Sequence, residues 1–179
     1  SIRLIATDHR AAAITNDVVC WLDGEWKSRQ LPKVPKISKH FRPEDFGSSH
    51  YLEGTTFYAG WDHGEWGGML ASIDLDDPQA TWVLLSGKPV GDSSGIPQYD
   101  PIQSIISPKK GDIWVATGLA HMDGRGLHHR DSGGKWHTLI DGDFIHDRGS
   151  TKLPSPSSIE GVAADHKGQL YILAGKIGI

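Results

Sequence analysis

The stretch "EGTTFYAGWDHGEWGGML", residues 53–70, recurs in outline as "KGDIWVATGLAHMDGRGL", residues 110–127, and the two align without a gap. The paired glycines are 57 residues apart, since 111 minus 54 and 124 minus 67 give the same offset. At this offset "SIEGVAADHKGQLYILAG", from Ser158, aligns with the segment that begins at Pro101. The chain therefore contains a tandem repeat, which is the first guide to its architecture.

Each repeat has the composition of short β-strands. Phe57, Trp114 and Tyr171 coincide under the offset, and each lies in a run of apolar and β-branched residues. A weaker echo places a tryptophan at the start of the last strand of each unit, at Trp26, Trp82 and Trp136. Glycine-bearing turns separate the strands, and no stretch has the sustained 3.6-residue periodicity of a long helix. We predict an all-β protein with four strands in each complete unit.

Tandem units of this length with four strands each are typical of β-propeller blades. A single blade cannot bury both of its faces, so neighbouring blades must pack together, and we interpret the repeated aromatic residues as packing material. We predict a β-propeller with about four blades' worth of four-stranded antiparallel sheets, in which the first and last blades are incomplete. The expected divisions are a partial blade and link at 1–49, a blade and link at 50–100, a blade and link at 101–157, and a partial blade at 158–179.

The strand count leaves two arrangements open. The chain is either a four-blade ring whose last blade is completed by both termini or, as we favour, a fragment of a larger propeller. An open fragment would expose unpaired strand edges. We therefore expect another chain or another copy to complete the propeller.

One hairpin resembles a known family motif. "DSGGKW", residues 131–136, resembles the Asp-box hairpin of sialidase-like propellers, although His129 and Lys135 replace the usual hydroxyl residues and the other units keep only the tryptophan. "LDGEW", residues 22–26, is similar to hairpins of sensor-type propellers. This resemblance implies a propeller fold but no single activity, because propellers include hydrolases, lyases, lectins and scaffolds. We expect the Asp131 carboxylate to accept hydrogen bonds from turn amides.

Charge and cysteine content exclude several classes of partner. The chain of 179 residues has 18 basic and 22 acidic side chains and a net charge of -4, so we expect neither nucleic acid nor a membrane as partner. No apolar stretch is long enough to span a bilayer, and we expect a soluble protein. The single cysteine, Cys20, excludes an internal disulfide and a thiolate zinc site, and its apolar neighbours indicate a buried side chain. No cofactor is predicted, and the compartment is left open, with secreted or periplasmic favoured over cytoplasmic.

Strand parity predicts where a binding site would form. In a four-stranded antiparallel blade, the middle turn and the link to the next blade lie at one face. The middle turns expected from Asp8, Trp61 and Gly118 each pair a histidine with a nearby aspartate, and the links are long. We predict a polar ligand site, without a metal, formed by Trp61, Asp62, His63, Glu65, Trp66, His121, Asp123 and His9. The alternative is that these side chains only solvate the loops or cap turns.

The turn "WDHGEWGG" from Trp61 gives the sharpest local signal. Indole rings stack on sugar faces and carboxylates accept hydrogen bonds from hydroxyls, so carbohydrate is the ligand class that fits both residue types. In the competing interpretation Trp61 and Trp66 fold back and fill the gap between blades. His128 and His129 are neighbours on one strand, so they point to opposite faces and cannot both serve one site.

Three functions follow from this pattern. The first is a non-catalytic propeller module that binds a polar small molecule or glycan on the face formed by the middle turns and links. The second is a glycoside hydrolase or polysaccharide lyase that uses the same face. The third is a scaffold for protein interactions. Whether the protein is an enzyme is left open, and no catalytic residue is assigned.

Overall fold

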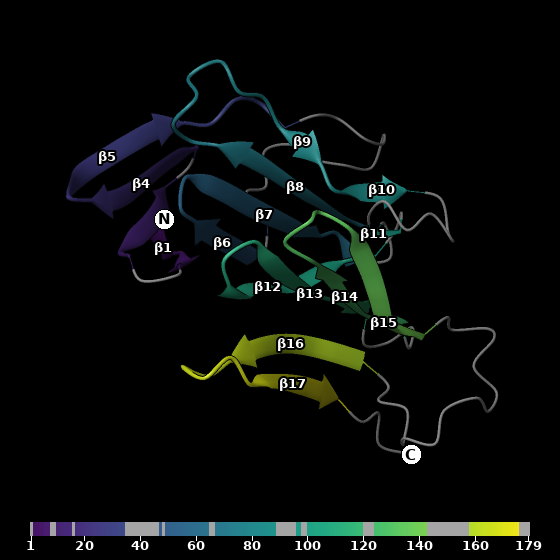
Figure 1. Cartoon of the computed structure of the whole chain (residues 1–179). Helices are drawn as coiled ribbons and strands as arrows, with labels where there is room; N and C mark the ends of the chain where they lie inside the picture. The colour runs from purple at the N-terminus through teal and green to yellow at the C-terminus, as the bar shows by residue number, and fades with distance from the viewer. Residues whose placement is uncertain are drawn as a thin grey trace.

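The computed structural model of the protein describes residues 2–7, 10–15, 17–34, 47, 49–64, 67–88, 96–97, 100–119, 124–142 and 158–175. The regular elements in these ranges are β-strands, which form three four-stranded antiparallel sheets and a hairpin (Figure 1). The prediction of an all-β protein is confirmed. Within the same ranges, no helix is long and apolar enough to cross a lipid bilayer.

The first sheet contains four antiparallel strands in the order β1 (Ile2–Leu4), β3 (Ala12–Thr15), β4 (Val18–Asp23) and β5 (Glu25–Gln30). The structure thus has four strands in the unit that we expected to be incomplete. The middle turn expected from Asp8 instead contains β3. Alanine has a weak preference for strands, but Ala12 and Ile14 are buried against the second sheet, and this tertiary contact favours the strand.

The second sheet contains β6 (Ser49–Glu53), β7 (Thr56–Asp62), β8 (Gly68–Asp74) and β9 (Val83–Leu84). A short strand, β2 (Ala6–Thr7), runs parallel to β6 and adds to the edge of this sheet. The segment that begins with β1 therefore passes from the first sheet to the second. A separate parallel pair, β10 (Ser86–Lys88) and β11 (Ile96–Pro97), follows β9.

The third sheet contains β12 (Ile102–Lys109), β13 (Asp112–Leu119), β14 (Gly124–Arg130) and β15 (Trp136–Gly142). The hairpin is formed by β16 (Ser158–Ala164) and β17 (Leu170–Gly175). Its two strands correspond to the first two strands of the third sheet. This succession of sheets is consistent with propeller blades.

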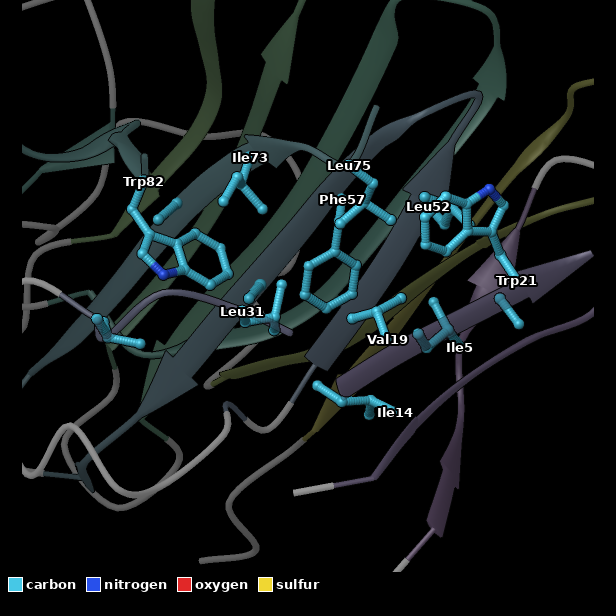
Figure 2. Close-up of a cluster of buried hydrophobic side chains, with 14 of the residues drawn as sticks. Ile5, Ile14, Val19, Trp21, Leu31, Leu52, Phe57, Ile73, Leu75 and Trp82 are labelled. Atoms are coloured by element: carbon cyan, nitrogen blue, oxygen red, sulfur yellow. The ribbon is translucent and has the colours of Figure 1, made fainter. Parts of the chain in front are cut away.

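Three apolar clusters lie between successive sheets. Figure 2 shows the first cluster, in which Val19 and Trp21 of the first sheet meet Phe57 and Trp82 of the second unit. The second cluster joins the second and third sheets and consists mainly of Tyr51, Tyr58, Leu70, Ile102, Ile105, Ile113, Val115 and Trp136. The third joins the third sheet to the hairpin and is centred on Ala116, Leu127, Ile159 and Val162. The second and third sheets therefore each use one face for the sheet before it and the other for the element after it.

The positions of these side chains correct the repeat alignment by one residue. Phe57 faces the first sheet, whereas Trp114 packs against the cluster shared with the following hairpin. The residue equivalent to Trp114 is Tyr58, which faces the following third sheet. The offset between these units is thus 56, since 114 minus 58 is 56. A slip of one residue reverses the face of every side chain in a strand, so a gapless sequence match could not detect it.

The turn glycines explain the slip. Glu53 pairs with Thr56, so Gly54 is the first residue of a two-residue turn, whereas Lys109 pairs with Asp112 and Gly111 is the second residue of its turn. Both glycines have left-handed φ angles, 56° at Gly54 and 80° at Gly111. Either position of such a turn favours glycine, so aligning the glycines does not fix the register.

The second and third sheets approach one another closely at Gly60 and Ile102. A Cβ atom at residue 60 would lie 2.3 Å from Cγ2 of Ile102 and 2.7 Å from its Cβ. Residue 60 therefore has to be glycine for β12 to pack this closely on β7.

We expect the substitution Gly60→Ala to lower the free energy of unfolding by about 1–3 kcal/mol, because overpacking forces the two sheets apart. Chemical denaturation measures the loss. Gly161→Ala is the control, since the nearest atom to its added Cβ is an ordinary 3.9 Å away. Ile102→Ala removes the clashing Cγ2 atom, so it should cost less stability in the Gly60→Ala background than in the wild type, and equal stability of Gly60→Ala and Gly161→Ala would contradict this packing.

Candidate functional site

Gln103 joins the ends of two middle turns. Its Nε2 atom donates to Oδ2 of Asp62, at the end of β7, and to the carbonyl oxygen of Gly118, near the end of β13, both at 2.8 Å. The Gly118 amide in turn donates to the Pro101 carbonyl at 3.0 Å. The strands that lead into the two middle turns therefore end beside one another, at the same end of the second and third sheets. We call this end, defined by Asp62, Asp100, Gln103 and Gly118, the mouth.

The link before β12 is held at the mouth by a close backbone contact. A Cβ atom at Gly68 would lie 2.3 Å from the Asp100 carbonyl oxygen and 2.6 Å from the Trp61 carbonyl oxygen. Only glycine leaves room for the link to cross the start of β8 at this distance. This contact brings Asp100, which precedes the third sheet, next to the β7–β8 turn of the second.

A buried polar cluster lies behind Asp100. His128 and Thr117 are fully buried on the face of the third sheet that looks toward the second. The Thr117 hydroxyl donates to Oδ2 of Asp100 at 3.1 Å, and Nε2 of His128 lies 3.3 Å from that hydroxyl and 3.5 Å from the same carboxylate oxygen. Nδ1 of His128 lies 3.1 Å from the Thr138 hydroxyl. Every polar atom of the imidazole ring thus has a partner, as a buried ring requires.

Gly126 makes space for this cluster. A Cβ atom there would lie 2.3 Å from the Thr117 hydroxyl and 2.5 Å from Nε2 of His128. Because Thr117 is fully buried, its hydroxyl is not accessible to a substrate. The cluster therefore orients the half-exposed Asp100 carboxylate, and it does not have the geometry of an exposed nucleophile and its base.

The structure places three of the predicted site residues in different surroundings. Asp62 is exposed, its Oδ1 accepts the Gly64 amide at 2.8 Å, and it is part of the mouth. His63 is half-buried, and its backbone amide donates to the Gly67 carbonyl at 2.9 Å. Trp61 is buried in the first cluster and meets Trp82 edge to face, with 5.8 Å between ring centroids, which is the packing alternative for this residue. His9, Glu65, Trp66, His121 and Asp123 lie outside the described residues.

Four residues of this region were not singled out as site residues from the sequence. Asp100, Gln103, Thr117 and His128 are far apart in the chain, and only the pairing of β12 with β13 and of β13 with β14 brings them together. The available signal is a polar residue next to a buried apolar one, as Gln103 follows Ile102 and Thr117 follows Ala116. His128 was noted, and it and His129 do point to opposite faces.

His129 belongs to a second polar group at the other end of the third sheet. Its ring stacks on Trp114 with 4.4 Å between centroids, and its Nε2 contacts Oδ1 of Asp112. The next imidazole, His137, stacks on His129 and pairs with Asp131 at 2.9 Å. No cluster of three or more metal-ligating side chains occurs among the residues that the structure describes.

Asp131 also accepts a turn amide, as expected. Its Oδ1 receives the Lys135 amide at 2.9 Å, and the backbone of the two residues pairs across the turn. The same arrangement recurs in the hairpin, where Oδ1 of Asp165 receives the Gln169 amide at 2.9 Å. The sixth residue after each aspartate, His137 or Tyr171, contacts the second carboxylate oxygen. Both aspartates therefore stabilise tight turns.

Among the described residues of the mouth, Asp62 and Asp100 contribute carboxylates. Gln103 contributes the acceptor Oε1, which no described residue engages. These atoms suit a ligand with several hydroxyl donors. Comparison with protein-family models and with curated proteins finds no match to this chain, so these comparisons do not indicate a ligand.

The pKa of Asp131 tests the geometry of its turn. The hydrogen bond from His137 and then that from the Lys135 amide lower this pKa below its ordinary value of 3.8. We expect His137→Ala to raise the pKa toward 3.8, as measured by NMR titration of the carboxyl carbon. Because the folded pKa is the lower one, the stabilising contribution is present above pH 3.8 and is lost as the pH falls through the folded value.

Leu139→Ala is the control for this titration, since Leu139 is exposed on the same strand. It should leave the pKa of Asp131 unchanged. An unchanged pKa in His137→Ala would show that His137 does not hold the carboxylate in solution.

Proposed function

We propose that this protein is a β-propeller module that binds a polyhydroxylated ligand at the mouth, with glycans as the ligand class that fits. In this proposal the stacked sheets are blades, and residues 131–136 form a degenerate Asp-box hairpin. The proposal is carried by the two hydrogen bonds of Gln103, which link Asp62 to Gly118 and so bring two middle turns to one place.

The hydrogen bonds within the mouth support a binding role. Asp62 uses one oxygen for the Gly64 amide and the other for Gln103, yet an ionised carboxylate can accept about four hydrogen bonds. Its side chain is exposed, so the remaining lone pairs can meet a ligand. The Asp100 carboxylate is half-exposed and is oriented from behind by Thr117 and His128. Three preorganised acceptors of this kind can receive hydrogen bonds from neighbouring sugar hydroxyls without reorganisation of the protein.

The burial of Trp61 changes the expected mode of recognition. This indole belongs to the core, so a sugar ring cannot stack on it. Recognition by described residues therefore rests on hydrogen bonds to Asp62, Asp100 and Gln103. The affinity should accordingly fall when ligand hydroxyls are methylated, and this loss distinguishes hydrogen bonding from stacking.

The test is binding of neutral oligosaccharides to the full chain, first in a glycan array and then by titration calorimetry with the best ligand. We expect Asp62→Asn to weaken binding about tenfold, because a charge-assisted hydrogen bond contributes roughly 1.5–3 kcal/mol. Asparagine keeps the Oδ1 acceptor for the Gly64 amide, but its Nδ2 atom cannot accept the hydrogen bond of Gln103. Circular dichroism and chemical denaturation of the variant therefore accompany the binding measurement.

Asp74→Asn is a matched control. Asp74 is also exposed and also accepts the amide two residues further along, but it pairs with Thr56 at the opposite end of β7 and β8. This variant should bind the ligand as the wild type does. Equal losses in the two variants, or no binding by the wild type to any glycan, would refute the proposal. Cleavage of the ligand by the wild type would instead favour the hydrolase or lyase alternative.

A further inference from the structure

The tryptophan that begins the last strand of each unit has a different environment in the first sheet. Trp82 and Trp136 are 8% and 4% exposed, whereas Trp26 is 65% exposed. The preceding sheet is what covers the two buried rings. Trp82 packs in the cluster shared with the first sheet and donates from Nε1 to the Pro32 carbonyl at 2.9 Å, and Trp136 packs in the cluster shared with the second. Trp26 occupies the corresponding position on a sheet that no described sheet precedes.

A second series of aromatic residues ends in the same way at the hairpin. Tyr58 is 4% exposed because the third sheet covers it, and Trp114 is partly buried against the hairpin. Tyr171 is equivalent to Trp114 and is 52% exposed. It points away from the third sheet together with Leu173, which is also exposed. We call the side of the hairpin that bears Tyr171 and Leu173 the Tyr171 face. Two faces are therefore left uncovered among the described residues. One is the face of the first sheet that bears Trp26, and the other is the face of the hairpin that bears Tyr171.

The uncovered face of the first sheet is uncharged and is apolar except at Thr15, Ser28 and Gln30. Strand pairing places Leu4, Ala13 and Cys20 in one row across the sheet. The row on one side of it contains Leu22 and Trp26, and the row on the other side begins with Ile2. We call this surface the Trp26 face. By strand pairing, its residues are Ile2, Leu4, Ala13, Thr15, Val18, Cys20, Leu22, Trp26, Ser28 and Gln30. None of them is charged, and each is half-buried or exposed. A contiguous apolar surface of this kind marks an interaction site.

We infer that the Trp26 face of one copy packs on the Tyr171 face of a second copy. This contact repeats the interfaces within the chain, where a face bearing Tyr58 or Trp114 packs on the next sheet. The two faces differ, so the association is heterologous and joins the first sheet of one copy to the hairpin of the next. Figure 1 shows these two elements as the first and last in the succession of sheets. The proposal is independent of the ligand site at the mouth.

Cys20 allows the contact to be mapped, because it is the only cysteine in the chain and lies on the Trp26 face. The experiment mixes wild-type protein with the double variant Cys20→Ser, Leu173→Cys and adds a short bismaleimide cross-linker. The heterologous contact predicts a cross-linked product containing one chain of each kind. A second mixture uses Cys20→Ser, Gln79→Cys, whose cysteine lies in an exposed turn away from both faces, and it should give no product.

The homodimeric products decide between arrangements. A Cys20–Cys20 product from the wild type alone would mean that two Trp26 faces meet, and it would overturn the proposal. A product from the Leu173→Cys variant alone would mean that two Tyr171 faces meet, with the same consequence.

Sedimentation velocity provides an independent measure. We expect the wild type to show a concentration-dependent mass above the 19.5 kDa of one chain. Trp26→Lys and Leu173→Lys should each sediment as monomers, and because both side chains are exposed, circular dichroism should show an unchanged fold. A wild type that remains a 19.5 kDa monomer at about 100 μM would refute the association.

Discussion

The packing of Ile102 against the bare backbone of Gly60 holds the second and third sheets together at short range. A four-stranded sheet with apolar side chains on both faces cannot be stable alone, because one face would remain in water. Here each sheet covers a face of its neighbour, and three apolar clusters result. The position of every other feature depends on this sheet-on-sheet contact, including the mouth and the uncovered faces at the two ends.

The mouth is polar because it lies where these apolar layers end. Strands that enter the turns there carry Asp62, Gln103 and Thr117, and the backbone groups freed at the strand ends need partners. Gln103 supplies two hydrogen bonds to these ends, and Thr117 with His128 satisfies the buried side of Asp100. The same residues therefore complete the structure and leave acceptors directed to solvent. A role in binding and a role in closing the sheet ends are compatible at this site.

The opposite end of the sheets is organised differently. Asp131 and Asp165 accept hydrogen bonds from amides of their own turns and from one following side chain of the same hairpin. Asp62 also caps its turn, but its second oxygen meets a residue from the neighbouring unit. This difference between local and inter-sheet partners is the structural reason to place the candidate site at the mouth.

Strand composition and turn chemistry are local properties, so the amino-acid sequence is enough to show a repeat of short strands separated by glycine turns. It also predicts that the middle turns of the second and third units lie together, through Asp62 and the residues before His121. The face that each side chain occupies follows instead from how the sheets pack. Phe57 and Tyr58 are both aromatic, so the sequence does not show which of them corresponds to Trp114. That correspondence depends on which face of the strand the following sheet covers. The same holds for the strand at Ala12–Thr15, where packing overcomes the weak strand preference of the alanines, and for the burial of Trp61. It also holds for the cluster of Asp100, Thr117 and His128. These features arise from contacts between residues far apart in the chain, which a single sequence does not display.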